Sequence, residues 1–384
     1  MSIKHNLNLC SEDELLLYCA RTNIDSETEK KILSLVQKNL NWEYLLKTAL
    51  THGLIPLFYS NINYICPENV PGYILDKLQS YFNENVCNNL LLAEELIKIL
   101  KLLKNENIDA IPYKGPILAI LAYRNVSFRQ FGDLDIFIPQ KNVQKAVKIL
   151  NSNGYISQMN LKNSQEFAFF KYQREYKLIN KKSKTSIEIK WKFPVSSFSF
   201  KSSFENIVGN SEFELIDFFN FPILTLSNED LILILCIHNA GHYWLKLKWI
   251  CDISEFIQAN NNLNWSLIID KANKLGIIRI LYINLALSKE LLGLKLPSEI
   301  ENALEKEKYV KSISFHIIEK FLFKSNQLKF NEKVILRFKI RENFKNKIKD
   351  LLNLMFIPTP NILKSRYLPR FAFPIYYLIR FLYL

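Results

Sequence analysis

The feature that most constrains this chain is the alternation of acidic and aliphatic residues from Asp133 to Ile138. Leu134, Ile136 and Ile138 occupy every second position, and Asp133 and Asp135 stand between them. A period of two is typical of a β-strand with one buried face, so both carboxylates project from the other face, about 7 Å apart along the backbone. Neighbouring acids repel each other, and burial favours neither unless a cation lies between them. The alternation therefore predicts a divalent metal at a strand end, with a solvated edge strand as the alternative.

A loop suited to phosphate lies upstream, at Lys114-Gly115-Pro116. Residues 108–113 predict a short strand, and 116–123 predict a helix with proline in its first turn. Gly115 lets the backbone approach an anion, the helix N-terminus supplies unpaired N–H groups, and Lys114 adds a positive charge.

A third carboxylate is offered by the segment 186–191. Ile187 and Ile189 point one way and Glu188 the other, so on a strand beside the acidic one Glu188 shares the face of the two aspartates. Mg²⁺ prefers hard oxygen ligands and keeps several waters, so two or three carboxylates with substrate phosphates suffice to hold it.

The order of helical and strand patterns predicts a helix-rich α+β fold with a mixed sheet in the middle. Residues 1–87 form a helical N-terminal region, 88–200 the core, and 201–384 a helical C-terminal domain with an apolar tail. An amphipathic helix is expected over 88–107 and another over 141–151. Helices are expected again over 245–259, 264–292, 298–322 and 329–356, and Ser227 has the character of a helix start.

Composition and charge bound the class of protein. The chain has 384 residues, enough for two or three domains. Its six cysteines form no C-x-x-C pair, and charged residues interrupt any secretory leader, which predicts free thiols in the cytoplasm. Of the formal net charge of +13, residues 306–370 carry 16 Lys and Arg against 5 Asp and Glu. Such a segment attracts nucleic acid, anionic lipid or polyphosphate, and a solvated helical face is the plainer interpretation.

Several further side chains are candidates for the same site. Arg129 precedes the acidic strand, where it would meet phosphate or a carboxylate, with structural pairing to Asp133 as the alternative. His238 and His242 stand four apart on an expected helix, which is the spacing of a zinc pair, but Asn239 replaces the glutamate of the metalloprotease motif. The same histidines, with Lys246, Lys248 or Asp252, are the expected pocket lining from the C-terminal helices; a core or surface role is the alternative.

Together these motifs resemble the polymerase-β-type nucleotidyltransferase superfamily, and in particular its bacterial branch of uncharacterised nucleotidyltransferases. The resemblance is carried by Lys114-Gly115, Arg129, Gly132-Asp133-Leu134-Asp135 and Glu188-Ile189-Lys190-Trp191. The wider superfamily has Gly-Ser at the first of these positions, and the branch has histidine where this chain has Lys190. Residues 52–57 and 231–252 resemble the helical flanks of the branch.

What the resemblance implies is a nucleotidyltransferase-type core that moves a nucleoside monophosphate from an NTP, expected to be ATP, to an acceptor hydroxyl. Mg²⁺, or Mn²⁺, would be held by Asp133, Asp135 and Glu188, which are also the catalytic set. The nucleotide would be bound by Lys114, Gly115, Arg129, Gly132, Lys190, His238 and His242. The expected acceptor is a small molecule. A tRNA- or protein-modifying toxin-type transferase, with RNA bound through 306–370, and a non-catalytic nucleotide-binding protein are the alternatives.

The chain ends in an apolar tail from Phe371 to Leu384. At 14 residues with Arg380 inside, it is shorter than a bilayer-spanning helix, so no transmembrane segment is expected. Docking on the body of the protein is the first interpretation, and lying on a membrane surface the second.

Overall fold

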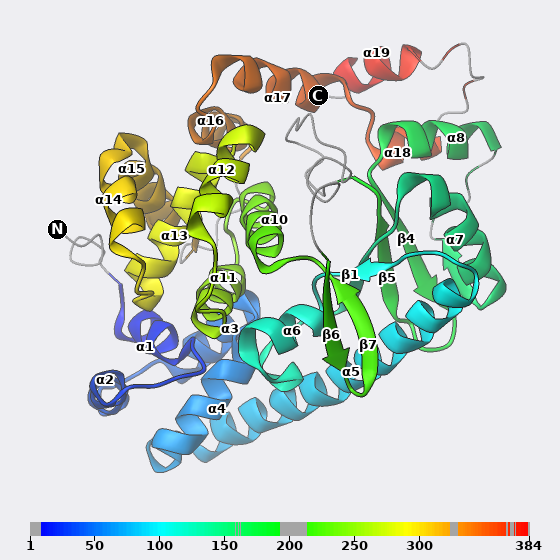
Figure 1. The fold of residues 1–384 in the computed structure, drawn as a ribbon. Coiled ribbons are helices and arrows are strands. Elements are labelled where there is room, and N and C mark those ends of the chain that lie inside the picture. The colour runs from blue at the N-terminus through cyan, green and yellow to red at the C-terminus, as the bar shows by residue number, and fades with distance from the viewer. Residues whose placement is uncertain are drawn as a thin grey trace.

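A computed structural model describes residues 9–157, 159, 161, 163–192, 213–322, 329–365, 368, 372 and 374–382. The remainder of the expected core, 193–200, and parts of the basic segment and the apolar tail lie outside this range. Figure 1 shows helices surrounding a sheet.

The N-terminal region is helical, as predicted. Its elements are α1 (Ser11–Cys19), α2 (Ser26–Val36), α3 (Trp42–His52), α4 (Ile55–Ile65), the 3-10 turn η2 (Pro67–Asn69) and α5 (Gly72–Asn105). The amphipathic helix expected over 88–107 is the second half of α5, which begins sixteen positions earlier. The boundary expected between 87 and 88 therefore falls inside one continuous helix.

A mixed sheet forms the core and confirms the α+β prediction. Its strands are β1 (Ile111–Pro112), β2 (Asp133–Phe137), β3 (Tyr155–Ser157), β4 (Glu175–Asn180) and β5 (Ser186–Lys190), in the order β1-β2-β5-β4-β3. β2 and β5 are parallel, whereas the other pairs are antiparallel. The strands β3 and β4 were not marked by the sequence pattern, although a hairpin-like turn was expected near 180–184, where β4 leads into β5.

The elements between the strands are α6 (Pro116–Tyr123), the 3-10 turn η3 (Val126–Phe128), α7 (Gln140–Ser152) and α8 (Asn163–Tyr172). α6 and α7 are the predicted helices, and α5 contacts both β2 and α7. Side-chain amides of α5 hold the loop before β2: Asn89 donates to the carbonyls of Val126 and Arg129, at 2.7 and 2.8 Å.

The C-terminal part begins with the hairpin β6 (Glu214–Phe218) and β7 (Phe221–Thr225), which the sequence did not predict. It continues with α10 (Asn228–Gly241), α11 (Leu247–Ala259), α12 (Trp265–Leu275), α13 (Ile278–Leu292), α14 (Ser298–Lys306), α15 (Lys308–Ile317) and the π turn η4 (Ile318–Leu322). The last elements are α16 (Phe330–Ile340), α17 (Phe344–Phe356), α18 (Pro360–Ser365) and α19 (Ile375–Leu382).

Two details of this region follow from local chemistry. The Ser227 hydroxyl caps α10 by accepting from the N–H of Asp230, which confirms the predicted helix start. The single helix expected over 264–292 is two helices, because Gly276 takes a left-handed conformation with φ of 65° and ends α12 there.

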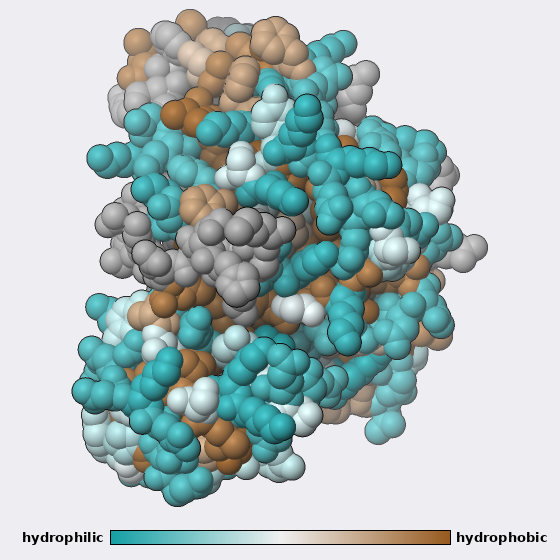
Figure 2. Space-filling view, turned by 90° about the vertical axis from the view of Figure 1, so that its left-hand side faces the viewer, coloured by the Kyte–Doolittle hydropathy of each residue, from teal (hydrophilic) through white to brown (hydrophobic). Residues whose placement is uncertain are grey.

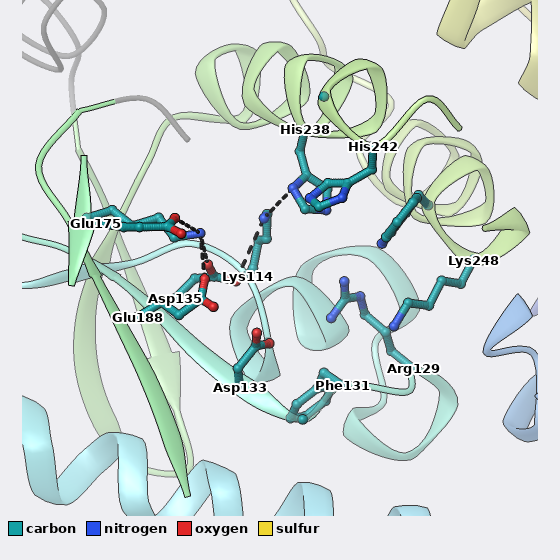
Figure 3. A pocket seen from close by; sticks show the side chains of 15 residues that line it. Lys114, Arg129, Phe131, Asp133, Asp135, Glu175, Glu188, His238, His242 and Lys248 are labelled. Carbon is teal, nitrogen blue, oxygen red and sulfur yellow. Dashed lines mark hydrogen bonds and ion pairs between the residues drawn. The ribbon is translucent and has the colours of Figure 1, made fainter. Parts of the chain in front are cut away.

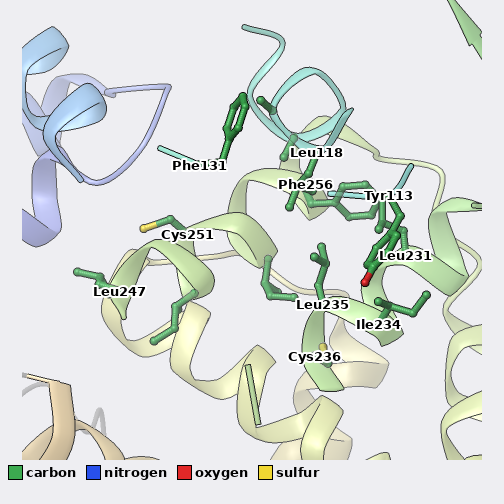
Figure 4. Close-up of a cluster of buried hydrophobic side chains, with 14 of the residues drawn as sticks. Tyr113, Leu118, Phe131, Leu231, Ile234, Leu235, Cys236, Leu247, Cys251 and Phe256 are labelled. Carbon is green, nitrogen blue, oxygen red and sulfur yellow. The ribbon is translucent and has the colours of Figure 1, made fainter. Parts of the chain in front are cut away.

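A shared apolar core ties α6 to the C-terminal helices. Figure 4 shows Leu231 and Leu235 of α10, Leu247 and Phe256 of α11, and Leu118 of α6 in one buried cluster. α6 begins directly after the Lys114-Gly115 loop, so this packing fixes that loop relative to α10 and α11.

The apolar tail rests on the body of the protein through one face of α19. Tyr376 is buried, and the Tyr377 ring packs edge-on against Tyr172 of α8, with ring centroids 5.3 Å apart. All six cysteines are free thiols. Within the described ranges, no helix reaches the combination of length and apolarity that crossing a bilayer requires.

Candidate active site

The register of the sheet gathers acidic residues on one face. β2 and β5 are parallel, and Asp135 pairs with Glu188. Asp133 precedes Asp135 by two positions and Lys190 follows Glu188 by two, so strand alternation puts all four side chains on the same face. The opposite face is apolar and buried; it carries Leu134, Ile136, Ile187 and Ile189. The structure thus places Glu188 beside the two aspartates, as the alternation predicts.

Figure 3 shows Asp135, Glu175 and Glu188 close together. Lys190 lies among these three acids and pairs with each of them. Its Nζ is 2.6 Å from Asp135 Oδ1, 3.0 Å from Glu188 Oε2 and 3.5 Å from Glu175 Oε2. Its side chain is only 5% exposed. Burial alone would lower the pKa of Lys190, but the surrounding anions, Asp135 first, raise it well above its ordinary value. The ammonium therefore stays charged between the carboxylates.

Lys114 projects from its loop toward both the acids and α10. Its Nζ donates to Nδ1 of His238 at 2.9 Å and lies 3.8 Å from Asp135 Oδ2. Burial lowers the pKa of Lys114 to about 8. Burial, followed by the nearby Lys114 ammonium, lowers the pKa of His238 well below its ordinary value. At neutral pH His238 is therefore uncharged and accepts this hydrogen bond, with its proton on Nε2.

The two aspartates differ in charge environment. Burial would raise the pKa of Asp135, but Lys114 and Lys190 outweigh it and hold that pKa well below the usual range. Burial, and then the charges of Asp135 and Glu188, raises the pKa of Asp133. The Asp133 carboxylate makes no hydrogen bond and no ion pair with the residues that the structure describes, and Lys114 and Lys190 act on its charge only at longer range. The negative charge of this face is thus paired directly at Asp135 and only weakly compensated at Asp133.

Gly115 owes its place to backbone geometry. It has φ of 56°, and a Cβ atom there would lie 3.1 Å from the carbonyl oxygen of Asp133. The loop therefore sits directly against β2, and its glycine allows both the left-handed conformation and the close approach. Gly132, at the start of β2, is exposed and has open space above it.

Arg129 has a partner that the sequence did not suggest. Its guanidinium makes two hydrogen bonds to Asp252 of α11, Nε to Oδ1 at 2.8 Å and Nη2 to Oδ2 at 2.9 Å. The Tyr123 hydroxyl donates to Asp252 Oδ1 as well. The predicted pairing of Arg129 with Asp133 is therefore wrong. Asp252 was also predicted to line the pocket, and that is wrong because its carboxylate binds Arg129 and Tyr123 instead.

Aromatic rings of α10 and α11 form one wall of the site. The ring centroids of His238 and His242 are 4.5 Å apart, and Trp249 lies 5.3 and 4.9 Å from them. Lys248 adds a charge beside them and donates to the Gln130 carbonyl at 3.1 Å. Burial lowers the pKa of Lys248 to about 8.

These side chains line a cavity of about 370 Å³, the size of a small-molecule site. Its lining consists of Lys114, Gly115, Arg129, Phe131, Gly132, Asp133, Asp135, Glu175, Glu188, Lys190, His238, Gly241, His242, Lys248 and Trp249. All the predicted nucleotide-binding residues are among them, whereas Lys246 is not. The sequence reasoning missed Phe131, Glu175, Gly241 and Trp249. The alternation of Glu175 and Lys177 with Tyr176 and Leu178 was the available signal for Glu175.

The carboxylates of this face are not arranged as a ready-made metal site. Among the residues that the structure describes, no three His, Cys, Asp or Glu side chains are grouped as a metal site. The physical reason is that the Lys190 ammonium pairs with both Asp135 and Glu188, at 2.6 and 3.0 Å. The His238–His242 pair likewise has no third ligand among the described residues, and Lys114 uses His238 Nδ1.

Comparison with known proteins agrees with this picture. The family model for uncharacterised nucleotidyltransferases matches residues 38–293, about two thirds of the chain. The chain belongs to this family. It is therefore placed among enzymes that transfer a nucleotidyl group, and the matched range includes every lining residue of the cavity. No curated protein matches the chain. No solved structure matches it either.

Proposed function

We propose that the chain is an Mg²⁺-dependent nucleotidyltransferase that moves a nucleoside monophosphate from ATP to a hydroxyl of a small acceptor. One observation carries the proposal. The β2–β5 register puts Asp133, Asp135 and Glu188 on one face of the sheet, and the Lys114-Gly115 loop borders the same cavity. Carboxylates beside a phosphate-binding loop are what phosphoryl chemistry at a metal requires.

The donor set fits Mg²⁺. All three side chains offer hard oxygen atoms, and the Asp133 carboxylate makes no direct ion pair with a described lysine or arginine, although Lys114 and Lys190 act on it at longer range. Asp133, Asp135 and Glu188 would hold the ion, with Lys190 withdrawing from between the last two. Bound there, Mg²⁺ supplies charge neutralisation on the phosphates and lowers the pKa of an attacking hydroxyl.

The phosphates would lie at the start of α6. Lys114 brings an ammonium into the cavity and Gly115 lines it. The two residues would bind the phosphates together, because glycine lets an anion approach the backbone closely. Pro116 has no N–H and the Ile117 N–H donates to the Lys114 carbonyl, so the first turn of α6 contributes less. Arg129 would act at longer range, because its guanidinium lines the cavity but is already bound to Asp252.

The reaction would be an in-line displacement at the α-phosphorus. A bond forms between the acceptor oxygen and the α-phosphorus as the bond to the bridging oxygen breaks, and pyrophosphate leaves. The acceptor proton would pass to a carboxylate of the acidic face, Glu188 being the expected base. His238 and His242, with Trp249, would contact the nucleoside, and the wall of rings suits stacking against a base.

The test is label transfer from ATP, labelled at the α-phosphate, in the presence of Mg²⁺ and pools of small molecules, RNA or protein. We expect pyrophosphate release and label in the small-molecule pool. Asp135→Asn should abolish both. Asp270→Asn, the same change at an exposed ion pair on α12, is the matched control and should leave them unaltered.

Each outcome decides something. Label in RNA or protein would support the transferase activity but show that the acceptor is a macromolecule, as in the toxin-type alternative. ATP binding without turnover in any pool would favour the non-catalytic alternative. Undiminished turnover in Asp135→Asn would refute the site itself.

A further inference from the structure

Three C-terminal helices turn apolar side chains outward. On α17 the exposed residues are Phe344, Ile348, Leu351 and Leu352. Their spacing of four, three and one is that of a single helix face. In an ordinary surface helix this face would be covered, so α17 has its apolar stripe on the outside.

The neighbouring helices continue this surface. α19 exposes Ile375, Leu378 and Leu382, and α16 exposes Ile335 and Phe338. α17 contacts both helices. We call the outward apolar residues of the three helices together the C-terminal apolar face. Figure 2 shows brown and tan side chains gathered at the top of the molecule, at the height where Figure 1 draws α17.

The far side of α19 shows that this exposure is not that of a loose tail. Tyr376 is buried, and Tyr377 packs on Tyr172, so α19 is anchored while Leu378 is 62% exposed. A groove of about 260 Å³ between α16 and α17 adds further concave apolar surface, lined by Ile335, Phe338 and Leu351.

Basic side chains border the face. Lys339 of α16 and Lys345 and Lys349 of α17 are exposed, and Lys347 lines the groove. The segment 306–370 to which they belong has 16 basic and 5 acidic residues. Exposed leucine, isoleucine and phenylalanine ringed by lysine is the chemistry of a surface that enters the headgroup region of an anionic bilayer.

Two other occupants fit less well. Pairing of two copies through this face would place two surfaces of the same positive charge against each other, and like charges repel. RNA would be attracted by the lysines, but the aliphatic side chains offer nothing to phosphates or base edges. We therefore propose that the C-terminal apolar face docks on an anionic lipid bilayer, an inference independent of the proposed catalytic function.

The test is co-sedimentation of the full chain with lipid vesicles of phosphatidylcholine alone or with about one third phosphatidylglycerol. We expect partition onto the anionic vesicles and weakening between about 0.1 M and 0.5 M salt. The variant Leu378→Asp, combined with Ile348→Asp, should reduce partition at least about tenfold. Leu91→Asp on α5 is the matched control, since Leu91 is 63% exposed, and it should not alter partition.

Three results would contradict docking of this face on a bilayer. Absence of binding to anionic vesicles, or equal loss in Leu91→Asp and the double variant, would overturn the proposal. So would a dimer in solution that the double variant dissociates, because the face would then be an interface between copies. Circular dichroism and thermal unfolding show whether both variants keep the wild-type fold, so that loss of vesicle binding can be assigned to the changed surface.

Discussion

Replacing Lys190 by methionine should destabilise the protein, because the buried carboxylates around it would lose their positively charged partner. Methionine has a similar length and no charge, so Asp135 and Glu188 would remain close together without their shared cation. Breaking a buried ion pair by removing one partner costs about 3–5 kcal/mol. Unfolding entropy is about 2.1 cal/mol/K per residue, or about 0.8 kcal/mol/K for 384 residues unfolding as one unit. The expected fall in Tm is therefore about 4–6 °C.

The chain offers a control on the same carboxylate. Lys177 pairs with Glu188 at 3.5 Å but is 46% exposed. Because an exposed pair contributes at most about 1 kcal/mol, Lys177→Met should lower Tm by about 1 °C or less. Thermal unfolding followed by circular dichroism compares the two variants directly.

The stability of Lys190→Met should also depend on Mg²⁺ and on pH. With the ammonium gone, a divalent ion present at about one hundred times its Kd should restore about 2.7 kcal/mol, or roughly 3 °C. The low pKa of Asp135 adds stability that is present above the unfolded carboxyl pKa of about 4 and is lost as pH falls further. The gap between wild type and Lys190→Met should therefore narrow below about pH 4. Equal Tm values for the two methionine variants, or no effect of Mg²⁺ on the first, would refute the reasoning.

Three more outcomes follow from the site. Because the pKa of Lys114 is about 8, metal-free ATP affinity should fall as pH rises above 8, by up to about tenfold per unit from this residue. Titration calorimetry should show a smaller fall in Lys114→Arg, because arginine stays charged and Lys248, whose pKa is also about 8, still loses its proton. Asp252→Asn should leave the Arg129 guanidinium buried without its counter-ion and cost about 3–5 kcal/mol in urea unfolding, and an unchanged midpoint would contradict that pairing. In Gly115→Ala the alanine would have a positive φ, which costs about 1–2 kcal/mol, and its Cβ would push the loop away from the Asp133 carbonyl. ATP should therefore bind about tenfold more weakly, and wild-type affinity would mean that the loop does not bind ATP.

Local patterns predicted the acidic strand and the helix that precedes it, because alternation within a strand and a proline at a helix start depend only on residues close together in the sequence. Alternation over Asp133–Ile138 fixes which side each residue faces, and the helix expected after Pro116 is α6 as observed. The same pattern placed Glu188 on the correct face because β5 alternates in the same way. Mixed-sheet architecture could be inferred from the order of elements, as the structure confirms.

Partners distant in sequence could not be predicted in this way. Arg129 and Asp252 are 123 positions apart, and their pairing depends on how α11 packs against α6. Lys190 was expected to bind nucleotide, and its pairing with Glu175 depends on the register of β4, a strand that was not anticipated. The metal ligands, the nucleotide and the acceptor stay predictions, since they concern molecules that bind to this cavity.

The Arg129–Asp252 pair has a consequence for how the molecule can be divided. It joins the loop before β2 to a helix more than a hundred positions downstream, and α10 and α11 supply the ring wall of the same cavity. A fragment ending after β5 would keep the acids of the sheet yet lose the counter-ion of Arg129 and the ring wall of the cavity. The helices that follow the sheet are thus a structural part of the cavity, and a fragment that keeps its whole lining must extend at least through α11.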